Sequence, residues 1–325
     1  MKFTSRVSAI LLLCLSLGPS WLSAQAADKF PSKQVTIVVP FLAGGAVDLA
    51  ARTLAEHIRQ RYNVAAVVEN RPGAGESIGV RQVIAAAPDG HTVLLGTVGG
   101  VAIAPQMLKD IGYDTRTALE PVALAIRAPN LLVVNAGLPI RNLRELVQHA
   151  KANPGKLSYA SSGVGTPQHL SGEMLKSVAG IDLLHIPYKG AAAGVVDVAG
   201  GQVSMTFASP ATVRPHIEKG TLVALGVTMP ERLASMPDVP IMKEEPLLAD
   251  YDLQSWFGMF APAGTPPAVL DKLNAIVTEG LNEPKAAERM RAQAGEPTRE
   301  SREAFKRFFA SEYLKFGQVL KGMGQ

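Results

Sequence analysis

Residues 75–79 read Gly-Glu-Ser-Ile-Gly and match the G-x-S-x-G pattern of a hydrolase nucleophile elbow. In that elbow the serine lies on a sharp turn directly between a central strand and a helix, where its hydroxyl can attack a carbonyl carbon. Here the preceding β-type run ends near Glu69, and the proline-containing segment 70–74 separates it from Ser77. A loop of this length does not form an elbow, so a serine hydrolase acting through Ser77 is a remote alternative.

Two glycine-rich segments have a composition suited to binding an anion. They read Pro-Phe-Leu-Ala-Gly-Gly-Ala at 40–46 and Ser-Ser-Gly-Val-Gly-Thr-Pro at 161–167, and each leads from a β-type run into a helical pattern. Glycine lets the backbone approach a ligand, and the free N–H groups at a helix start carry a positive partial charge. The hydroxyl groups of the second segment suit carboxylate oxygens. Glycine turns and capping hydroxyls also occur at strand ends for structural reasons, so each segment alone also fits a structural role.

Three further polar residues have both a structural and a functional interpretation. Asp48 falls in the first turn of a predicted helix, where the helix dipole stabilises a carboxylate whether or not it contacts a ligand. His169 fits a capping or surface side chain better than a base, and Lys189 could neutralise a second carboxylate or be solvated. The sequence has neither the lysine motif of a nucleotide site nor a metal-ligand spacing of His, Asp and Glu, so no cofactor and no metal are expected.

The elements that must position these residues follow from the hydrophobic pattern. A first series has β-type runs at 35–39, 65–68 and 92–95 and helical patterns at 47–61 and 78–86. A second series has β-type runs at 131–134, 157–160, 183–186 and 203–207, and helices opened by Asn142, by Pro167 and near 191–198. After a run at 222–227, the last elements are an extended segment at 253–261 and helices that start at Pro266 and near Ser301. This alternation predicts two α/β units, each a parallel sheet flanked by helices, with a cleft between them.

The N-terminus and the charge balance bear on location and partners. Lys2 and Arg6 precede an apolar run at 7–17 and the small-residue pattern at 24–26, which predicts a signal peptide over residues 1–26. The apolar run is too short to span a bilayer. Cleavage would remove Cys14, the only cysteine, so neither thiol chemistry nor a disulfide is expected in the exported chain. The 32 Lys and Arg and 28 Asp and Glu are interspersed, and no basic stripe suggests nucleic acid as a partner.

With both glycine segments in place, the chain resembles the tripartite tricarboxylate transporter receptors, also called the Bug family of periplasmic solute-binding proteins. The segments that carry the resemblance run over essentially the whole mature chain and include VTIVVPFLAGGAVDLAAR, VVENRPGAGESIG, AAPDGHTVLLGT, LSYASSGVGTPQHLSGEMLK, HIPYKGAAAGVVDVAGG and SWFGMFAPAGTP. The resemblance implies an α/β, two-lobed periplasmic-binding-protein fold of type II, the Venus flytrap, with a ligand cleft between the lobes. Lobe one would comprise residues 27–127 plus 250–325, and lobe two residues 128–249.

The resemblance also implies a function without catalysis. Such a protein captures a small organic carboxylate between its lobes in the periplasm, and its closed form is recognised by the membrane permease subunits of a tripartite tricarboxylate transporter. We expect a monomer. A periplasmic ligand sensor that signals to a membrane kinase uses the same fold and is the alternative.

The family's ligand contacts can be carried over by position. In lobe one they fall on Phe41, Ala43, Gly44, Gly45, Asp48, Thr97 and Val98. In lobe two they fall on Ser161, Ser162, Gly163, Gly165, Thr166, Tyr188, Lys189, Gly190 and Ser209.

Several positions depart from the family pattern and bear on the ligand. Val47 replaces a small hydroxyl residue, residues 99–101 replace a frequent Thr-His pair, and Ala208 replaces a frequent Asp, so we expect a ligand with a larger apolar portion, such as an aromatic or branched carboxylate. Ser77 stands near the start of a helix where Asn is common. Glu76 stands where glycine is usual, and we expect it to face solvent, the alternative being contact with a ligand's amino group.

Overall fold

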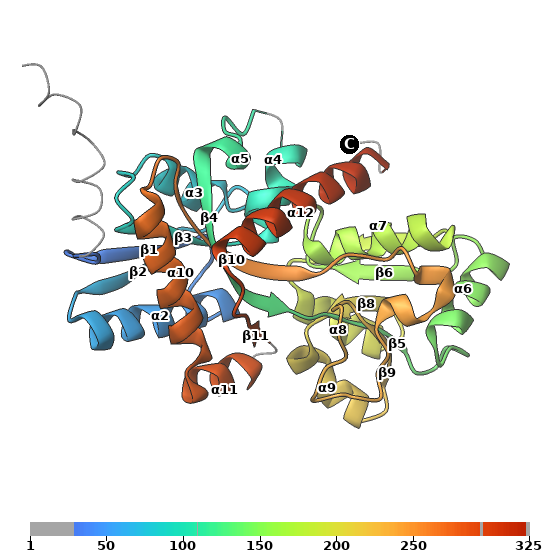
Figure 1. Cartoon of the computed structure of the whole chain (residues 1–325). Helices are drawn as coiled ribbons and strands as arrows, with labels where there is room; N and C mark the ends of the chain where they lie inside the picture. Colours follow the sequence, from blue (N-terminus) through green and yellow to red (C-terminus); the bar gives the residue numbers. More distant parts are fainter. Residues whose placement is uncertain (1–28, 109, 293–294, 323–325) are drawn as a thin grey trace, which may run out of the picture.

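The computed structural model of the protein describes residues 29–108, 110–292 and 295–322, so the predicted signal peptide lies outside the described residues. Two β-sheets lie side by side along the molecule, each with helices on both faces (Figure 1). Among the described residues, no helix combines the length and the apolar character needed to cross a membrane. The predicted α/β fold with two lobes is confirmed.

The first sheet has the strand order β11-β4-β10-β3-β1-β2. Its strands are β1 (Val35–Val39), β2 (Ala66–Asn70), β3 (Thr92–Thr97), β4 (Leu119–Ala128), β10 (Ser255–Pro262) and β11 (Glu296–Pro297). β2 and β3 pair with β1 in parallel, whereas β10 runs antiparallel to both β3 and β4, and β11 runs antiparallel to β4. The runs predicted at 35–39, 65–68 and 92–95 are thus parallel as expected, whereas β10, predicted only as an extended segment, and β11 run in the opposite direction. Hydrophobic periodicity carries no information on strand direction.

The second sheet has the strand order β7-β6-β8-β5-β9. Its strands are β5 (Leu131–Asn135), β6 (Ser158–Ser161), β7 (Leu184–Pro187), β8 (Met205–Ala208) and β9 (Leu222–Val227). β6 pairs in parallel with β7 and β8, and β5 runs antiparallel to β8 and β9. β5 therefore runs opposite to the other four strands of this sheet, and the parallel direction predicted for the run at 131–134 was wrong.

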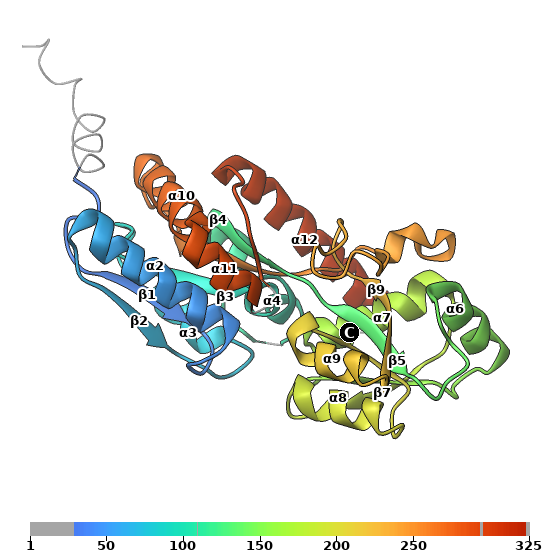
Figure 2. The ribbon, with the colours of Figure 1, turned by 90° about the horizontal axis from the view of Figure 1, so that it is seen from below.

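Helices cover both faces of each sheet (Figures 1 and 2). Around the first sheet lie α2 (Ala46–Tyr62), α3 (Ser77–Ile84), the π-helical turn η1 (Gly99–Ile103), α4 (Ala104–Met107), α5 (Thr115–Ala118), α10 (Pro267–Asn282), α11 (Pro284–Ala292) and α12 (Arg302–Gly322). Around the second lie α6 (Leu143–Ala152), α7 (Pro167–Ala179), α8 (Ala191–Ala199) and α9 (Pro210–Glu218). The short turns η2 (Met242–Glu244) and η3 (Pro246–Leu248) precede β10.

Several predicted helix starts can be compared with the structure. Asn142 caps α6 by accepting the N–H of Glu145 at 2.9 Å, and Thr166 caps α7 directly before Pro167, as predicted. The helix expected to start at Pro266 begins instead at Pro267. The hydroxyl of Thr265 donates to the carbonyl of Pro262 at 2.8 Å and so does not cap this helix.

The apolar core joins the two sheets. One buried cluster combines Val38 and Leu94 of the first sheet with Leu132 and Phe207 of the second, and the aromatic face of α12 packs into it. Two further clusters fill the opposite faces, one under α2 and α10 and one under α8 and α9. The sheets are thus held by a shared core at their junction, where β4 leads into β5 and the chain returns through β10.

Candidate ligand site between the two sheets

A cavity of about 1040 Å³ opens between the two sheets. It is lined by the segments that follow the carboxyl ends of β1, β2, β3, β6 and β8, together with the residues around the crossing into β5 and the start of β10. In α/β proteins ligands bind in such crevices beyond the carboxyl ends of parallel strands. The fold therefore brings both predicted glycine segments to one site.

Most of the predicted ligand-binding residues line this cavity. From the first lobe these are Phe41, Ala43, Gly45, Asp48, Thr97 and Val98, and from the second Ser162, Gly165, Thr166 and Ser209. The cavity lining does not include Gly44, Ser161, Gly163, Tyr188, Lys189 or Gly190. The last three follow β7, which is an edge strand of the second sheet, and Tyr188 donates its hydroxyl to Asp197 at 2.6 Å. For these six residues, the position does not support the predicted ligand contact.

Asp48 holds the first glycine segment in place through hydrogen bonds. Its Oδ2 accepts the N–H of Gly44 at 2.9 Å and Nε of Arg52 at 2.8 Å, and its Oδ1 accepts Nδ2 of Asn70 at 3.0 Å. Burial alone would raise the pKa of Asp48, but these hydrogen bonds together lower it below its usual value. With Gly44 at φ 97°, a conformation that favours glycine, the carboxylate fixes the turn that leads into α2.

In the second glycine segment, the hydroxyls are engaged within the loop. Ser161 is buried, and its Oγ lies 2.7 Å from Nε2 of His185 and also accepts the N–H of Gly163. Thr166 Oγ1 donates to the carbonyl of Gly163 at 2.7 Å. His169 accepts the N–H of Gly165 at 3.1 Å, and burial lowers the pKa of this ring. These hydrogen bonds fix the conformation of the loop. Because the hydroxyl of Ser161 is directed at His185 and Gly163, Ser161 lies behind the cavity wall.

The cavity also contains residues that the sequence did not single out. Trp256 and Phe257 enter from β10, Ile103, Ala104 and Met107 from η1 and α4, and Pro129 and Asn130 from the crossing into β5. These residues give the site a largely apolar wall. The segment SWFGMFAPAGTP resembles the family and could have pointed to β10, whereas Ile103, Ala104 and Met107 carry no signal of this kind.

Glu76 does not face solvent, and the prediction of solvent exposure was wrong. The side chain is 9% exposed, and its Oε1 accepts the hydroxyl of Thr97 at 2.5 Å, while Oε2 accepts the N–H of Thr97 at 3.3 Å. The carboxylate fits here because residues 99 and 100 are glycines: a Cβ atom at Gly100 would lie 2.5 Å from Glu76 Oε2. Glu76 occupies the N-cap position of α3 with φ 73° but its side chain makes no capping hydrogen bond, and its burial raises its pKa to about 8.

Ser77 begins α3, as expected for this position. The side chain is 1% exposed, and its Oγ accepts a hydrogen bond from Nη2 of Arg81 at 2.9 Å. The loop 71–76 separates it from β2. This arrangement gives no support to a nucleophilic role.

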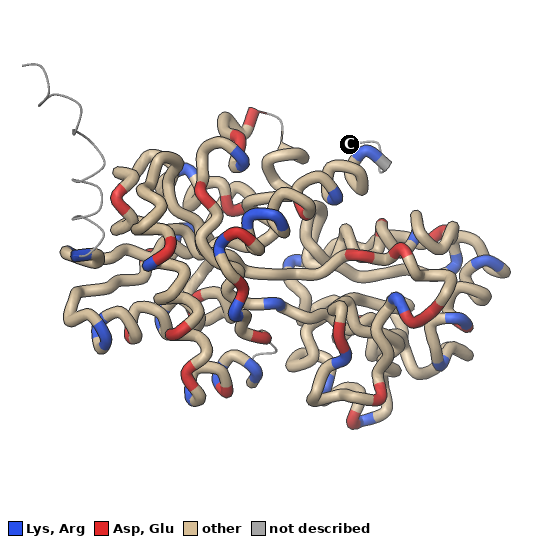
Figure 3. Tube along the Cα trace, in the orientation of Figure 1, with Lys and Arg blue, Asp and Glu red and all other residues tan. Residues whose placement is uncertain are grey.

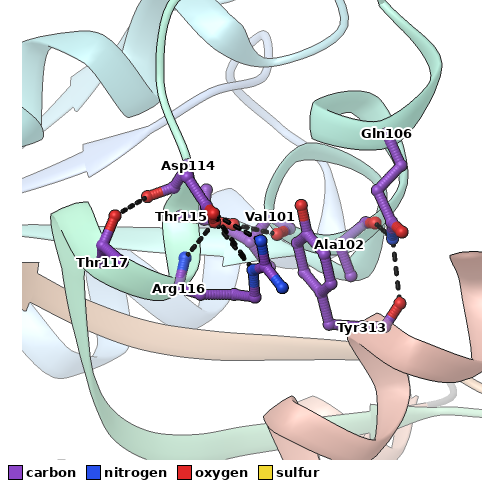
Figure 4. Close-up of polar contacts among 8 residues, drawn as sticks. All are labelled: Val101, Ala102, Gln106, Asp114, Thr115, Arg116, Thr117 and Tyr313. Carbon is purple, nitrogen blue, oxygen red and sulfur yellow. Dashed lines mark hydrogen bonds and ion pairs between the residues drawn. The ribbon is translucent and has the colours of Figure 1, made fainter.

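A set of polar contacts fixes the backbone of η1 beside Glu76 (Figure 4). The hydroxyl of Thr115 donates to the carbonyl of Val101 at 2.7 Å. Nε2 of Gln106 donates to the carbonyls of Ala102 at 2.6 Å and Tyr313 at 2.9 Å, which ties η1 to α12. Gly99 and Gly100 are therefore held in place and cannot easily yield to a larger side chain.

Gly100→Ala is expected to destabilise the protein by about 1 to 3 kcal/mol, because its methyl group would overlap Glu76 while η1 is held by α5 and α12. In a Glu76→Gly background the same substitution should cost almost nothing. Denaturant unfolding of the four proteins in this double-mutant cycle checks the prediction. Equal costs in the two backgrounds would contradict it.

Charge is distributed unevenly between the surface and the cavity. Along the described chain, Lys and Arg are interspersed with Asp and Glu over both lobes (Figure 3). The described residues that line the cavity include Asp48 and Glu76 but no Lys, Arg or His. Nor do the described residues contain a group of three His, Cys, Asp or Glu that could hold a metal ion. Recognition of an anion here has to come from backbone N–H groups, hydroxyls and helix dipoles.

The fold and the interlobe cavity together define a two-lobed protein of the periplasmic-binding class. The model of the tripartite tricarboxylate transporter receptor family matches residues 50–325, and the chain belongs to this family.

Relatives and solved structures agree with this assignment. A UPF0065 protein of Bordetella pertussis is 34% identical over 319 residues, which covers 98% of this chain and 96% of that protein. The structure of the periplasmic binding protein BugD is 36% identical and has a TM-score of 0.72, with 91% of this chain and 99% of BugD covered. An R. palustris protein solved with adipate is 32% identical and has a TM-score of 0.76, with 91% and 98% covered.

Proposed function

We propose that the protein is a periplasmic solute receptor that captures a small organic carboxylate between its lobes and delivers it to the permease subunits of a tripartite tricarboxylate transporter. The observation that carries the proposal is the convergence of three helix N-termini on one cavity. The capping residues of α2, α7 and α9 are Gly45, Thr166 and Ser209, and all three line it. Helix N-termini from both lobes would hold an anion and favour closure around it.

The apolar wall supports a ligand with a substantial apolar portion. Phe41, Val47, Met107, Trp256 and Phe257 all line the cavity. Its volume of about 1040 Å³ lies slightly above the usual range for small-molecule sites, about 300 to 1,000 Å³. Adipate in the R. palustris relative is a carboxylate with an apolar chain, which is consistent with such a ligand.

Gly45→Asp should weaken the binding of carboxylates at least about tenfold, because it places a negative charge at the N-terminus of α2 inside the cavity. The substitution fits the fold, since nothing lies within 4 Å of a Cβ atom at Gly45 and aspartate is a favoured capping residue. Gly45→Asn is the matched neutral control and should retain most of the affinity. Calorimetric titration of refolded, solute-free protein with aliphatic and aromatic carboxylates measures both.

The wild-type protein should gain about 2.7 kcal/mol of stability at a ligand concentration of 100 times the dissociation constant. A thermal-shift screen with the same carboxylates identifies which of them bind. The proposed function is wrong if no carboxylate raises the melting temperature, or if Gly45→Asp binds acids as tightly as Gly45→Asn.

A further inference from the structure

We propose that Glu76 recognises a cationic group of the ligand, so that the solute carried by this protein has a protonated amine in addition to its carboxylate. The inference rests on the proposed function and specifies its ligand class. It comes from one side chain at the cavity wall, whose surroundings are unlike those of the other acidic residue there.

Every hydrogen bond that reaches Glu76 treats its carboxyl group as an acceptor. The hydroxyl of Thr97 accepts the N–H of Gly99 at 3.1 Å, so its own proton is free to be donated to Oε1 of Glu76. The N–H groups of Thr97 and Gly100 are directed at the same carboxyl group. Donors arranged in this way favour the ionised form of a carboxyl group. These donors lower the pKa of Glu76, but burial outweighs them and the net pKa is raised to about 8.

This carboxylate has no cation beside it among the described residues. Asp48, the other acid at the cavity, is paired with Arg52 at 2.8 Å. Arg81 lies one turn along α3 from Glu76, but its guanidinium donates to Ser77 Oγ at 2.9 Å and to the carbonyl of Ile111 at 3.2 Å. Tyr113 is the remaining titratable neighbour, and its pKa is raised to about 12, mainly by burial and partly by Glu76. A buried carboxylate without a counter-charge is unfavourable, and a cation from outside would complete the site.

The carboxyl group lies where a bound solute would meet it. Glu76 lines the cavity together with Thr97, whose hydroxyl and N–H both donate to the carboxyl group of Glu76. An ammonium group at this place would donate a charge-assisted hydrogen bond to the carboxylate. A second carboxylate of the solute would instead be repelled, unless Glu76 gave it a proton.

A change in the protonation of Glu76 on ligand binding distinguishes recognition of a cation from a purely structural role. Its pKa of about 8 means that the solute-free protein carries a proton on Glu76 at pH 7. An ammonium ion that binds there forces ionisation, and this proton is released to the buffer. A ligand carboxylate that accepted a hydrogen bond from Glu76 would require the proton to stay and would promote proton uptake.

The test compares acids with and without an amino group on the refolded, solute-free protein. Suitable pairs are glutamate with glutarate, aminohexanoate with hexanoate, and phenylalanine with phenylpropanoate. In at least one pair the amino acid should bind about tenfold or more tightly than its partner. Calorimetry at pH 7 in buffers of different ionisation enthalpy should show proton release on binding.

Glu76→Gln keeps the shape of the side chain and removes the charge. We expect it to abolish the preference for the amino member and the proton release, while binding of the acid without the amino group changes little. Glu56→Gln is the matched control, because Glu56 is an exposed residue on α2 outside the cavity lining. It changes the net charge by the same amount and should leave both readouts unaltered.

Three results would overturn the inference: tighter binding of the acids without an amino group, an unchanged preference in Glu76→Gln, or proton uptake on binding. If acids bind without regard to the amino group, the role of Glu76 fails and the proposed function stands. If neither member of any pair binds, the carboxylate site itself fails, and this inference fails with it.

Discussion

Glu76→Gln should raise the free energy of unfolding of the solute-free protein by about 3 to 5 kcal/mol more at pH 9 than at pH 5. The folded-state pKa of Glu76 is about 8, against about 4.5 for an unperturbed glutamate. Between these values, the folded protein keeps a proton that the unfolded chain releases, so the stability of the wild type falls as the pH rises from 4.5 through 8. A glutamine does not titrate, and its amide can accept from the N–H of Thr97 and donate to the hydroxyl of the same residue.

Denaturant unfolding at both pH values measures this difference, and the titration of all other groups cancels between variant and wild type. Glu56→Gln, at an exposed position, should behave like the wild type at both pH values. A Glu76→Gln effect of the same size at pH 5 and pH 9 would show that Glu76 does not titrate in this range.

Glu312→Ala should destabilise the protein by about 3 to 5 kcal/mol. Glu312 lies on α12 and is 1% exposed; it accepts Nε1 of Trp256 at 2.8 Å and forms an ion pair with Lys315. Its loss leaves a buried indole N–H without a partner and leaves Lys315 with Asp252, at 3.1 Å, as its remaining ion-pair partner. Because Trp256 is the second residue of β10 and lines the cavity, we expect the structural change to fall at the junction between the lobes.

Trp256 itself can report this unfolding. The chain has two tryptophans, and the other, Trp21, lies in the predicted signal peptide. Glu303→Ala, on the same helix but with a side chain 60% exposed, is the matched control and should change stability by no more than about 0.5 kcal/mol. An equal loss in the free energy of unfolding for the two variants would mean that the buried hydrogen bond between Glu312 and Trp256 does not stabilise the protein.

The elements best predicted from sequence are those with a complete local signal. The run 35–39 and the helix after it have clear periodicity, and Asn142 and Thr166 carry their own capping chemistry. β4 was missed because its run is apolar almost throughout and shows no alternation, which does not separate a buried strand from a helix. α9 was missed because Pro215 lies inside it, where proline normally argues against a helix, although Pro210 stands at the first helical position, which proline favours.

The residues of the candidate site also fall into those that the sequence could predict and those that it could not. The glycine segments could be found because their composition is suited to close approach and to helix starts. Ser161 looked equally suitable, but its hydroxyl points to His185, and the sequence cannot show which side of a loop a hydroxyl takes. The burial of Glu76 depends on space left by Gly99 and Gly100, more than 20 residues along the chain, and no local pattern reveals such a fit.

The left-handed backbone at Glu76 has a consequence for how this receptor evolves. A glycine at position 76 would adopt φ 73° without the strain of about 1 kcal/mol that a side chain carries there, and it would also remove a buried carboxylate. Selection for stability alone therefore acts against the glutamate. If Glu76 binds the solute as proposed, loss of that binding should allow position 76 to change to glycine, while the residues of the core persist. Under the proposed role of Glu76, the residue at position 76 therefore indicates whether the bound solute carries an amine.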